Sequence, residues 1–498
     1  MTYELNKKLH NKIDSLIDEY CDNEELLLKL DSFVYTQLPN YLRNLNNTQM
    51  ERVNRKNLLE GQSQKFIEQF MNKAQYYYCS STEIFFEYKD NTYSCIREDI
   101  VLYNILTAIS EKKILLPWKY KIKISIMKRI KEQNIFISTP NTETIQKIIS
   151  IIYQLCNMNK ESVKYFLTII GDIMLKKKTS NIYFVSSGIK PLLKELSNNG
   201  YLLFGTASIS NHFKYRYYDH KYNDSRLIPY KGNISYDIVK SSINNNVIID
   251  LFLVACYFSN RYENSDVFIQ DFCKDESMKE YVMYMKQNDE KSIVNKFLLK
   301  MTETSVDNNN IIKWKDMNYL WKIYNEMNEY PNIIFSGTLK EHMNEHFGEN
   351  YIPEDDIFHN ITSSYLPDVR RFIAFWEEQI YETDDQIEYE IDELFYLFQT
   401  QYKSSTMSEG KIMSLIKHYQ TDVVIEDNKY VMNIGAKQWN KKKEIDDFLC
   451  NNTVFYAVDD SNNQIDIDST YEMYKNKCTN AKKRLSKRYF EKYILEYN

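Results

Sequence analysis

The scarcity of glycine and proline constrains the fold of this chain more than any other feature. The 498 residues include only ten glycines and eight prolines, whereas average proteins contain about 7% Gly and about 5% Pro. Both residues interrupt regular helices, so a chain that has few of them is expected to form long helices. The same scarcity excludes collagen-like folds and Gly-rich linkers.

Length and composition then indicate the number of domains and the fold class. A single hydrophobic core rarely serves more than about 250–300 residues, so we expect several domains. Hydrophobic residues make up 43% of the chain and charged residues 27%, which is near the globular average and predicts that most of the chain folds. We predict a mostly α fold with small β elements (α+β), with a helical N-terminal half and a C-terminal winged-helix-like region.

Changes in hydrophobic pattern along the chain divide it into four predicted domains. A run without apolar periodicity, Thr302–Asn310, is the predicted linker at the main boundary. The domains are residues 1–179, helical with a β-hairpin insertion near 74–96; 180–301, mixed α/β; 311–380, a helical connector; and 381–498, winged-helix-like.

Short β-prone or acidic runs add local predictions. The KDN segment between EIFFEY and TYSCI is typical of a hairpin turn. The runs IYFVSS, YLLFG and PNIIF are predicted to contain strands. The acidic run Glu377–Glu393 is predicted to be a solvated connector.

The C-terminal region has the element order of a winged helix. EIDELFYLFQTQY and EGKIMSLIKHYQ are helical in pattern, and DVVIEDNKYVMNI reads as two strands around Asp427–Asn428. In a winged helix the second helix commonly reads nucleic acid, and the hairpin forms the wing. The alternative is an ordinary α+β hairpin that packs on its own helices.

Charge and cysteine content restrict the partners and the compartment. The formal net charge of −6 argues against nucleic-acid binding by bulk charge, so any site for a polyanion must be local. The eight cysteines form no CxxC pair, which indicates a reducing compartment and neither a zinc ribbon nor a disulfide framework. No apolar run reaches the 18 residues needed to span a bilayer, so we expect a soluble cytoplasmic protein without a membrane partner.

Basic and aromatic residues occur together in three clusters, the combination that binds phosphates and stacks on bases. The alternative for each cluster is a solvated face in a lysine-rich chain. In the winged-helix-like region, Lys411, Lys417 and His418 would face DNA or RNA, and Lys429 would lie on the wing. The clusters contain Lys119, Lys121, Lys123, Lys128 and Arg129; Lys214, Arg216 and Arg226; and Lys482, Lys483, Arg484, Lys487 and Arg488.

Catalytic, cofactor and metal motifs are weak in this sequence. Ser186–Lys190 is the nearest approach to a phosphate-binding loop, but it has one glycine and no Ser or Thr after the lysine. His342 and His346 have the spacing of zinc ligands without a third ligand, so two exposed histidines are the simpler interpretation. His212 and His220 flank a loop that could support acid–base or metal chemistry, or could pack on tyrosines. We therefore expect no cofactor, no metal and no catalytic residue.

Several stretches carry a resemblance to known proteins. ILLPWKYKIK, KYFLTIIGDIMLKK, FKYRYYDHKYNDSRLI, YPNIIFSGTLKEHM, ITSSYLPDVRRFIAFWEE and SKRYFEKYI resemble a family of uncharacterised proteins of giant nucleocytoplasmic DNA viruses of the mimivirus type. The similarity runs from about Glu83 to Ile494, and it implies viral origin and expression in the host cytoplasm, at the viral factory. YFLTIIGD, IYFVSSGIKPLLKEL and the C-terminal region also resemble parts of poxvirus-type primase-helicases, without the phosphate-loop residues of their ATPase motif.

Three functions follow as hypotheses. The first is a non-catalytic protein associated with DNA or RNA, acting in genome replication or expression of a large DNA virus. The second is a helical scaffold that binds other viral or host proteins, in which Trp314, Trp321 and Trp376 would line interfaces. The third is a diverged nucleotide-binding enzyme that uses residues 180–230.

Overall fold

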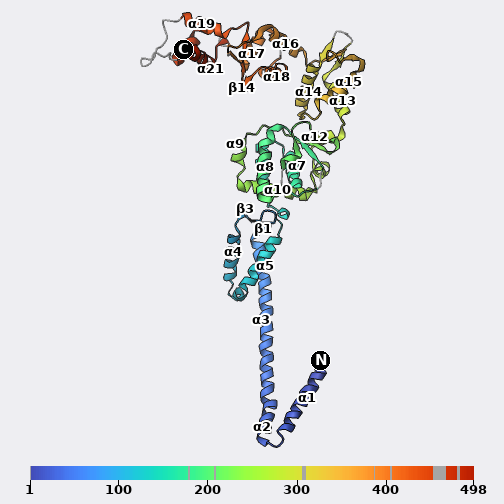
Figure 1. The fold of residues 1–498 in the computed structure, drawn as a ribbon, viewed down its shortest axis with the longest axis vertical. Helices are drawn as coiled ribbons and strands as arrows, with labels where there is room; N and C mark the ends of the chain where they lie inside the picture. Colours follow the sequence, from blue (N-terminus) through green and yellow to red (C-terminus); the bar gives the residue numbers. More distant parts are fainter. Residues whose placement is uncertain are drawn as a thin grey trace. The chain divides into compact units, whose positions relative to one another are not determined.

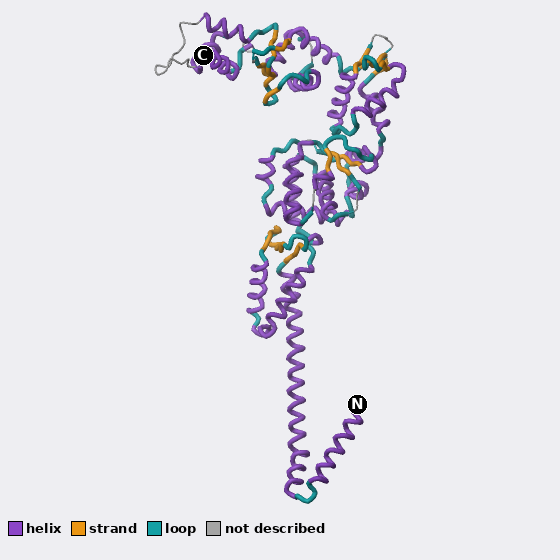
Figure 2. Tube along the Cα trace, viewed as in Figure 1, coloured by secondary structure: helices purple, strands orange, loops and turns teal. Residues whose placement is uncertain are grey.

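The structure is a computed structural model that describes residues 2–177, 180–206, 209–230, 232–305, 310–385, 387–403, 406–451, 467–478 and 483–497. Helices predominate and strands are short (Figure 2), as the mostly α prediction with small β elements requires. The chain divides into two compact units. The first contains Met1–Ser180, Ser187–Phe213 and Tyr230–Lys279, and the second contains Asn181–Ser186, Lys214–Pro229 and Glu280–Asn498.

This division differs from the main boundary that the sequence suggested at 302–310. Helices on both sides of that segment share one hydrophobic core in the second unit, where Phe297 packs edge-on against Trp321 at 5.2 Å. Residues 303–304 also form a short strand rather than part of a linker. Residues 306–309 lie outside the described part of the chain.

The first unit is built mainly from helices. Figure 1 shows that α3 extends well beyond α4 and α5. The helices and strands are α1 (Thr2–Glu19), α2 (Glu24–Ser32), α3 (Leu38–Lys73), β1 (Gln75–Cys79), β2 (Ile84–Lys89), β3 (Thr92–Ile96), α4 (Glu98–Ser110), α5 (Lys119–Glu132), α6 (Thr142–Cys156), α7 (Lys160–Met174), α8 (Lys190–Phe204), α9 (Tyr236–Ser242), α10 (Asn245–Tyr262) and α11 (Ser265–Val267).

The predicted hairpin near 74–96 is confirmed as part of a three-stranded antiparallel sheet, β1–β2–β3. Asp90 and Asn91 both have positive φ, 51° and 61°, and join β2 to β3 where the KDN turn was expected. Below this sheet, Ile67 of α3 packs in one cluster with Ile105 of α4 and Ile126 of α5. The C-terminal end of α3 is therefore anchored by burial.

Helices α7 and α10 form a close pair in the same unit. A Cβ at Gly171 of α7 would lie 2.1 Å from the carbonyl O of Ala255 in α10, so only glycine allows this approach. Asp250 of α10 is fully buried, and it accepts hydrogen bonds from the Tyr93 N–H (2.7 Å) and the Thr92 hydroxyl (2.9 Å). These bonds join α10 to β3.

The prediction of a strand at YLLFG was wrong, because these residues belong to the end of α8. Leu192, Leu196, Gly200 and Phe204 are buried at four-residue intervals, which is the period of a helix face. Gly205 follows in the left-handed conformation (φ 66°) and ends the helix.

The second unit combines helices with several small sheets. Its elements are β4 (Ile182–Phe184), β6 (Ser225–Leu227), α13 (Glu290–Met301), β7 (Glu303–Thr304), β8 (Ile311–Lys313), α14 (Trp314–Asn328), α15 (Ser336–Phe347), β9 (Tyr351–Ile352), β10 (Ile357–His359), β11 (Ile361–Thr362), α16 (Pro367–Gln379), β12 (Ile380–Glu382), β13 (Glu388–Glu390), α17 (Ile391–Gln401), α18 (Glu409–Tyr419), β14 (Ile425–Glu426), β15 (Tyr430–Met432), β16 (Ile434–Ala436), α19 (Lys441–Asn451), α20 (Ile467–Lys477) and α21 (Lys487–Tyr497). Two elements, β5 (Phe213–Lys214) and α12 (Glu276–Gln287), cross the boundary between the units.

Small antiparallel sheets support α17 and α18. β13, β15 and β14 form one sheet in that order, and β12 pairs with β16. Asp427 and Asn428 have positive φ (51° and 53°) and form the turn between β14 and β15 where the sequence predicted it.

Two further predictions in this unit were wrong. PNIIF forms no strand; Ile333 and Ile334 instead enter the core as part of the described turn between α14 and α15. The acidic run Glu377–Glu393 is not a solvated connector, since it includes β12 and β13, and Glu388 is 1% exposed. Glu393 is buried as well, and its carboxylate accepts the Glu390 N–H as half of a capping box that begins α17.

Candidate functional site

The predicted cations of α5 do not share one face of the helix. Ile122, Ile126 and Ile130 are buried on the inner side. Lys121 and Lys128 are seven residues apart and lie on one side, whereas Lys119 and Lys123 are four apart and lie on another. Arg129 belongs to neither pair.

These lysines have weak partners in the first unit. The Lys121 ammonium lies 4.0 Å above the Trp118 ring and 3.9 Å from Glu60, and Lys128 lies 3.9 Å from Glu132. Lys119 donates to the Ser110 hydroxyl (3.0 Å), and Lys123 lies 5.7 Å above the Tyr120 ring. Exposed pairs of this kind contribute little, so Lys121 and Lys128 could still contact an anion.

In the 214–226 loop, only part of the predicted set is accessible. Lys214 lies 3.9 Å above the Tyr218 ring, and Arg216 is exposed. Arg226 is 2% exposed, and its guanidinium donates to the carbonyl oxygens of Asn223 (2.7 Å) and Ser225 (2.9 Å). Arg226 therefore stabilises the loop through these hydrogen bonds. The prediction that it contacts a phosphate is wrong.

The described histidines agree with the simpler interpretations only in part. The His220 ring packs against Phe184 (4.6 Å) and Tyr222 (5.0 Å), and burial lowers the pKa of His220. The Nε2 of His342 lies 3.2 Å from the Glu290 carboxylate, so His342 is in contact rather than exposed as predicted, whereas His346 is exposed. Among the described residues, no three His, Cys, Asp or Glu side chains could together hold a metal ion.

The phosphate-loop-like segment has a packing role at its glycine. A Cβ at Gly188 would lie 2.3 Å from the carbonyl O of Gly232, and the Ile234 N–H donates to the Gly188 carbonyl at 3.1 Å. The chain itself therefore occupies the space beside Gly188.

On α18, one of the predicted contact residues faces inward. The Nε2 of His418 lies 2.9 Å from the Lys315 carbonyl O, and its ring packs against Tyr319 of α14 at 5.2 Å. Burial, first of all, lowers the pKa of His418. His418 thus contacts α14, while Lys411 is partly exposed and Lys417 donates to the Asn428 side chain (2.6 Å).

The predicted cations of the wing and the tail are mostly paired with carboxylates. Lys429 lies 2.7 Å from Glu390, and Lys487 lies 2.5 Å from Asp468. Arg488 is surrounded by Glu426 (2.8 Å), Glu388 (3.5 Å) and Asp427 (3.5 Å). Lys483 donates to the Gln438 carbonyl (3.1 Å), Arg484 lines a cavity with Glu390 and Asp392, and Lys482 lies outside the described residues. These acidic neighbours lower the local positive potential.

The N-terminal arm, residues 2–60, exposes most of its described side chains. None of its described side chains from residue 3 onward is buried. Apolar side chains are nevertheless exposed along it, among them Leu9 (54%), Leu42 (54%) and Met50 (58%). The sequence showed the helices of this arm but not that their apolar positions stay uncovered.

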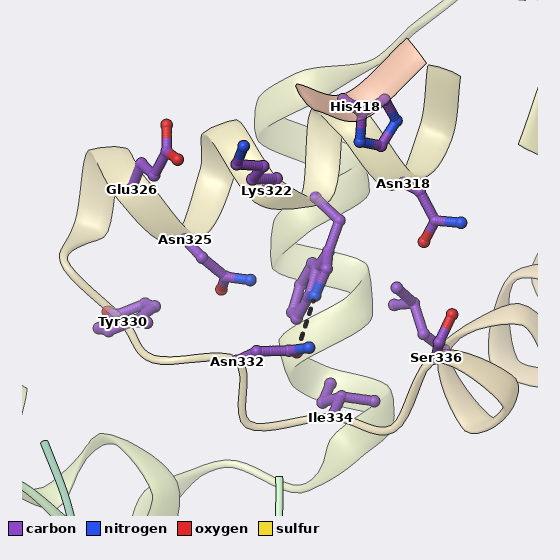
Figure 3. A pocket seen from close by; sticks show the side chains of 11 residues that line it. Asn318, Lys322, Asn325, Glu326, Tyr330, Asn332, Ile334, Ser336 and His418 are labelled. Atoms are coloured by element: carbon purple, nitrogen blue, oxygen red, sulfur yellow. Dashed lines mark hydrogen bonds between the residues drawn. The ribbon is translucent and has the colours of Figure 1, made fainter. Parts of the chain in front are cut away.

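A pocket that the sequence analysis missed lies beside α14 (Figure 3). Its volume is about 460 Å³, within the range of ligand sites. Asn318, Asn325 and Asn332 recur at seven-residue intervals, a spacing that could have indicated a shared side of α14 and the turn after it. The prediction that Trp321 and Trp376 line protein interfaces is wrong, because their side chains are only 5% and 8% exposed.

Among the described helices, none alone has the length and apolar composition needed to cross a membrane. Taken together, α9 and α10 have that length and composition, but the chain bends by 87° between them. The chain matches no protein-family model, no curated protein and no solved structure.

Proposed function

We propose that the protein is a helical adaptor whose N-terminal arm docks an amphipathic helix of another viral or host protein. The observation that carries this proposal is the arm itself, which presents exposed leucines over a long helix without any buried side chain before Ser63. Large exposed apolar surfaces mark interaction sites in soluble proteins.

The length of the arm suits a stable interface. The part of α3 that belongs to the arm, residues 38–60, spans about 35 Å at 1.5 Å per residue. A standard interface buries about 800 Å² on each partner, which a helix of this length can supply along one face. In α1, Leu5, Leu9 and Leu16 recur at helical spacing, as in helices that bind other helices.

Charge on the arm restricts the partner. Residues 13–25 contain six carboxylates and no lysine or arginine: Asp14, Asp18, Glu19, Asp22, Glu24 and Glu25. A partner helix with basic residues opposite this segment would be favoured electrostatically.

The test compares two double variants of the full chain. Leu9→Lys with Leu42→Lys places charge on the apolar positions, and Asn11→Lys with Asn46→Lys adds the same charge at polar positions of the same helices. Affinity capture from nuclease-treated lysate should recover a partner with the wild type and the asparagine variant but not with the leucine variant. Identical recovery by both variants would refute the proposal, as would a dimer in light scattering that only the leucine variant dissociates.

Nucleic-acid binding is the second candidate. Its support is the order α16, β12, β13, α17, α18, β14, β15 with the sheet order β13–β15–β14. Apart from the additional strand β12, this is the arrangement expected for a winged helix. Lys411 and Lys417 on α18, with the Asp427–Asn428 turn as a short wing, would form the contact surface.

This second candidate has its own test. In gel-shift titrations across salt with duplex, single-stranded and RNA probes, Lys411→Ala with Lys417→Ala should flatten the log–log salt slope by about 0.9 per lost phosphate contact. Lys442→Ala, whose ammonium pairs with Asp385 at 3.1 Å, is the control. An unchanged slope in the double variant would exclude this surface. Viral origin and a place in the host cytoplasm stay predictions.

A further inference from the structure

The pocket beside α14 has features of a ligand site that the adaptor function does not use. Its walls come from α14, the turn after it, the start of α15 and His418 of α18. Figure 3 shows the side chains of Asn325, Asn332 and Lys322 around this space. All these elements belong to the second unit.

One wall of the pocket is aromatic and fixed in place. The Trp321 Nε1–H donates to Asn332 Oδ1 at 3.3 Å (Figure 3), and the indole stacks on Tyr324 with a centroid distance of 5.6 Å. Ile334 and Leu339 are fully buried beneath it and form an apolar floor. The aromatic and apolar lining suits a flat, largely apolar ligand.

Asn325 supplies an unused polar group. This residue is 7% exposed, yet its buried Oδ1 accepts no hydrogen bond. Buried polar atoms without a partner are rare in folded proteins, and each one calls for an explanation. A carboxamide presents a donor and an acceptor side by side, which is the pattern that pairs with the N6 and N7 edge of adenine.

Lys322 adds a positive charge at the same pocket. Its ammonium is hydrogen-bonded to the Ser414 hydroxyl at 3.1 Å, and among the described residues no carboxylate lies within ion-pair distance of it. Glu326 lies one turn further along α14 on the exposed rim, where a carboxylate can accept from sugar hydroxyls. An ammonium without a carboxylate partner favours a phosphate group.

From this geometry we propose that the pocket binds an adenine nucleotide. The Asn325 carboxamide pairs with the base edge, Trp321 and Ile334 contact the base, and Lys322 contacts the phosphate. An adenine base with a phosphate occurs in two kinds of ligand, a free mononucleotide and an unpaired adenine nucleotide of a single strand.

Calorimetric titration of the full chain with AMP, adenosine, CMP and an oligo(dA) strand tests this proposal. We expect AMP to bind at least 10-fold more tightly than CMP. Asn325→Leu should weaken AMP binding about 10- to 100-fold without lowering the melting temperature, because it removes a buried group that has no partner. Asn344→Leu is the matched control, since its Oδ1 is also buried without a partner but does not line the pocket.

Further measurements separate the role of Lys322 and the source of the base. Lys322→Gln should weaken AMP binding but leave adenosine binding unchanged. Oligo(dA) binding that is tighter than AMP binding would identify the strand as the source, and the reverse order would identify the free nucleotide. Absence of saturable AMP binding, or equal AMP affinity of wild type and Asn325→Leu, would overturn the proposal. Neither result gives information about the N-terminal arm, so the adaptor function is tested separately.

Discussion

The ammonium of Lys441 lies 2.5 Å from the carboxylate of Glu393, and both side chains are buried at the junction of α19, α17 and β13. Lys441 also donates to the Glu388 carbonyl (2.9 Å) and lies above the rings of Tyr389 (4.4 Å) and Tyr489 (5.1 Å). Burial lowers the pKa of Lys441 and raises the pKa of Glu393, while the opposite charge of each partner counteracts both shifts. The pair therefore keeps its charges only while both partners are present.

Replacing Lys441 by methionine should destabilise the second unit strongly. The substitution leaves Glu393 buried without its counterion, which costs about 3–5 kcal/mol. Urea unfolding followed by tryptophan fluorescence measures this change, because four of the five tryptophans lie in the second unit. Lys442→Met is the control: its pair with Asp385 is exposed, so the loss should stay below about 1 kcal/mol. Equal losses in the two variants would contradict the assigned role of the buried pair.

Alanine at two helical glycines should have opposite effects. In Gly171→Ala the new methyl would lie 2.1 Å from the Ala255 carbonyl O, so α7 and α10 must move apart, at a cost of about 1–3 kcal/mol or more. In Gly61→Ala the methyl meets no atom within 4 Å, and alanine should stabilise α3 by about 0.5–1 kcal/mol. Urea unfolding followed by circular dichroism checks both values. Stabilisation by Gly171→Ala would show that the two helices are not in this close contact.

Acidification should weaken the contact between α14 and α18 through His418. Its folded pKa is lowered, first by burial and then by the charges of Lys322 and Lys315, against the raising effects of the Lys315 carbonyl and Asp316. The unfolded chain, with a His pKa of about 6.5, then binds more protons than the folded one. The stability contribution is therefore complete above pH 6.5 and is lost as the pH falls below it.

Unfolding titrations at pH 7.5 and pH 5.5 check the His418 prediction. The wild type should lose more stability than His418→Gln between these two values. His346→Gln removes an exposed imidazole and should lose as much stability as the wild type. A pH dependence that His418→Gln leaves unchanged would argue against a buried neutral imidazole.

The contributions of Asp250 and Asp289 to the free energy of unfolding should change with pH in opposite directions. Burial raises the pKa of Asp250, against the lowering effects of its hydrogen bonds and of Lys147. Its contribution to stability is therefore complete below about pH 3.8 and is lost as the pH rises through the folded pKa. Hydrogen bonds from Ser292 lower the pKa of Asp289, so that contribution is present above about pH 3.8 and is lost as the pH falls.

The stability of the wild type relative to each asparagine variant, measured from pH 3 to pH 7, tests these signs. The difference from Asp250→Asn should shrink as the pH rises, and the difference from Asp289→Asn should grow. The same slope for both variants would mean that Asp250 is solvated rather than buried.

Local features of the chain could be predicted from the sequence because they depend on neighbouring residues. The scarcity of glycine and proline indicated helices, and Asp90–Asn91 and Asp427–Asn428 fell in the expected turns because these residue types tolerate positive φ. YLLFG shows the limit of local pattern, since a short apolar run suits a strand or a buried helix end equally, and α8 determines the outcome.

Tertiary structure alone decided which charges are available and which apolar groups stay uncovered. The sequence places Arg488 and Arg226 among basic and aromatic residues, but only folding brings Glu426 to Arg488 and buries the guanidinium of Arg226. Likewise, Leu9 and Leu192 have similar helical neighbourhoods in sequence, yet one is exposed and the other is core. Burial and ion pairing depend on residues distant along the chain, and a local pattern carries no information about those neighbours.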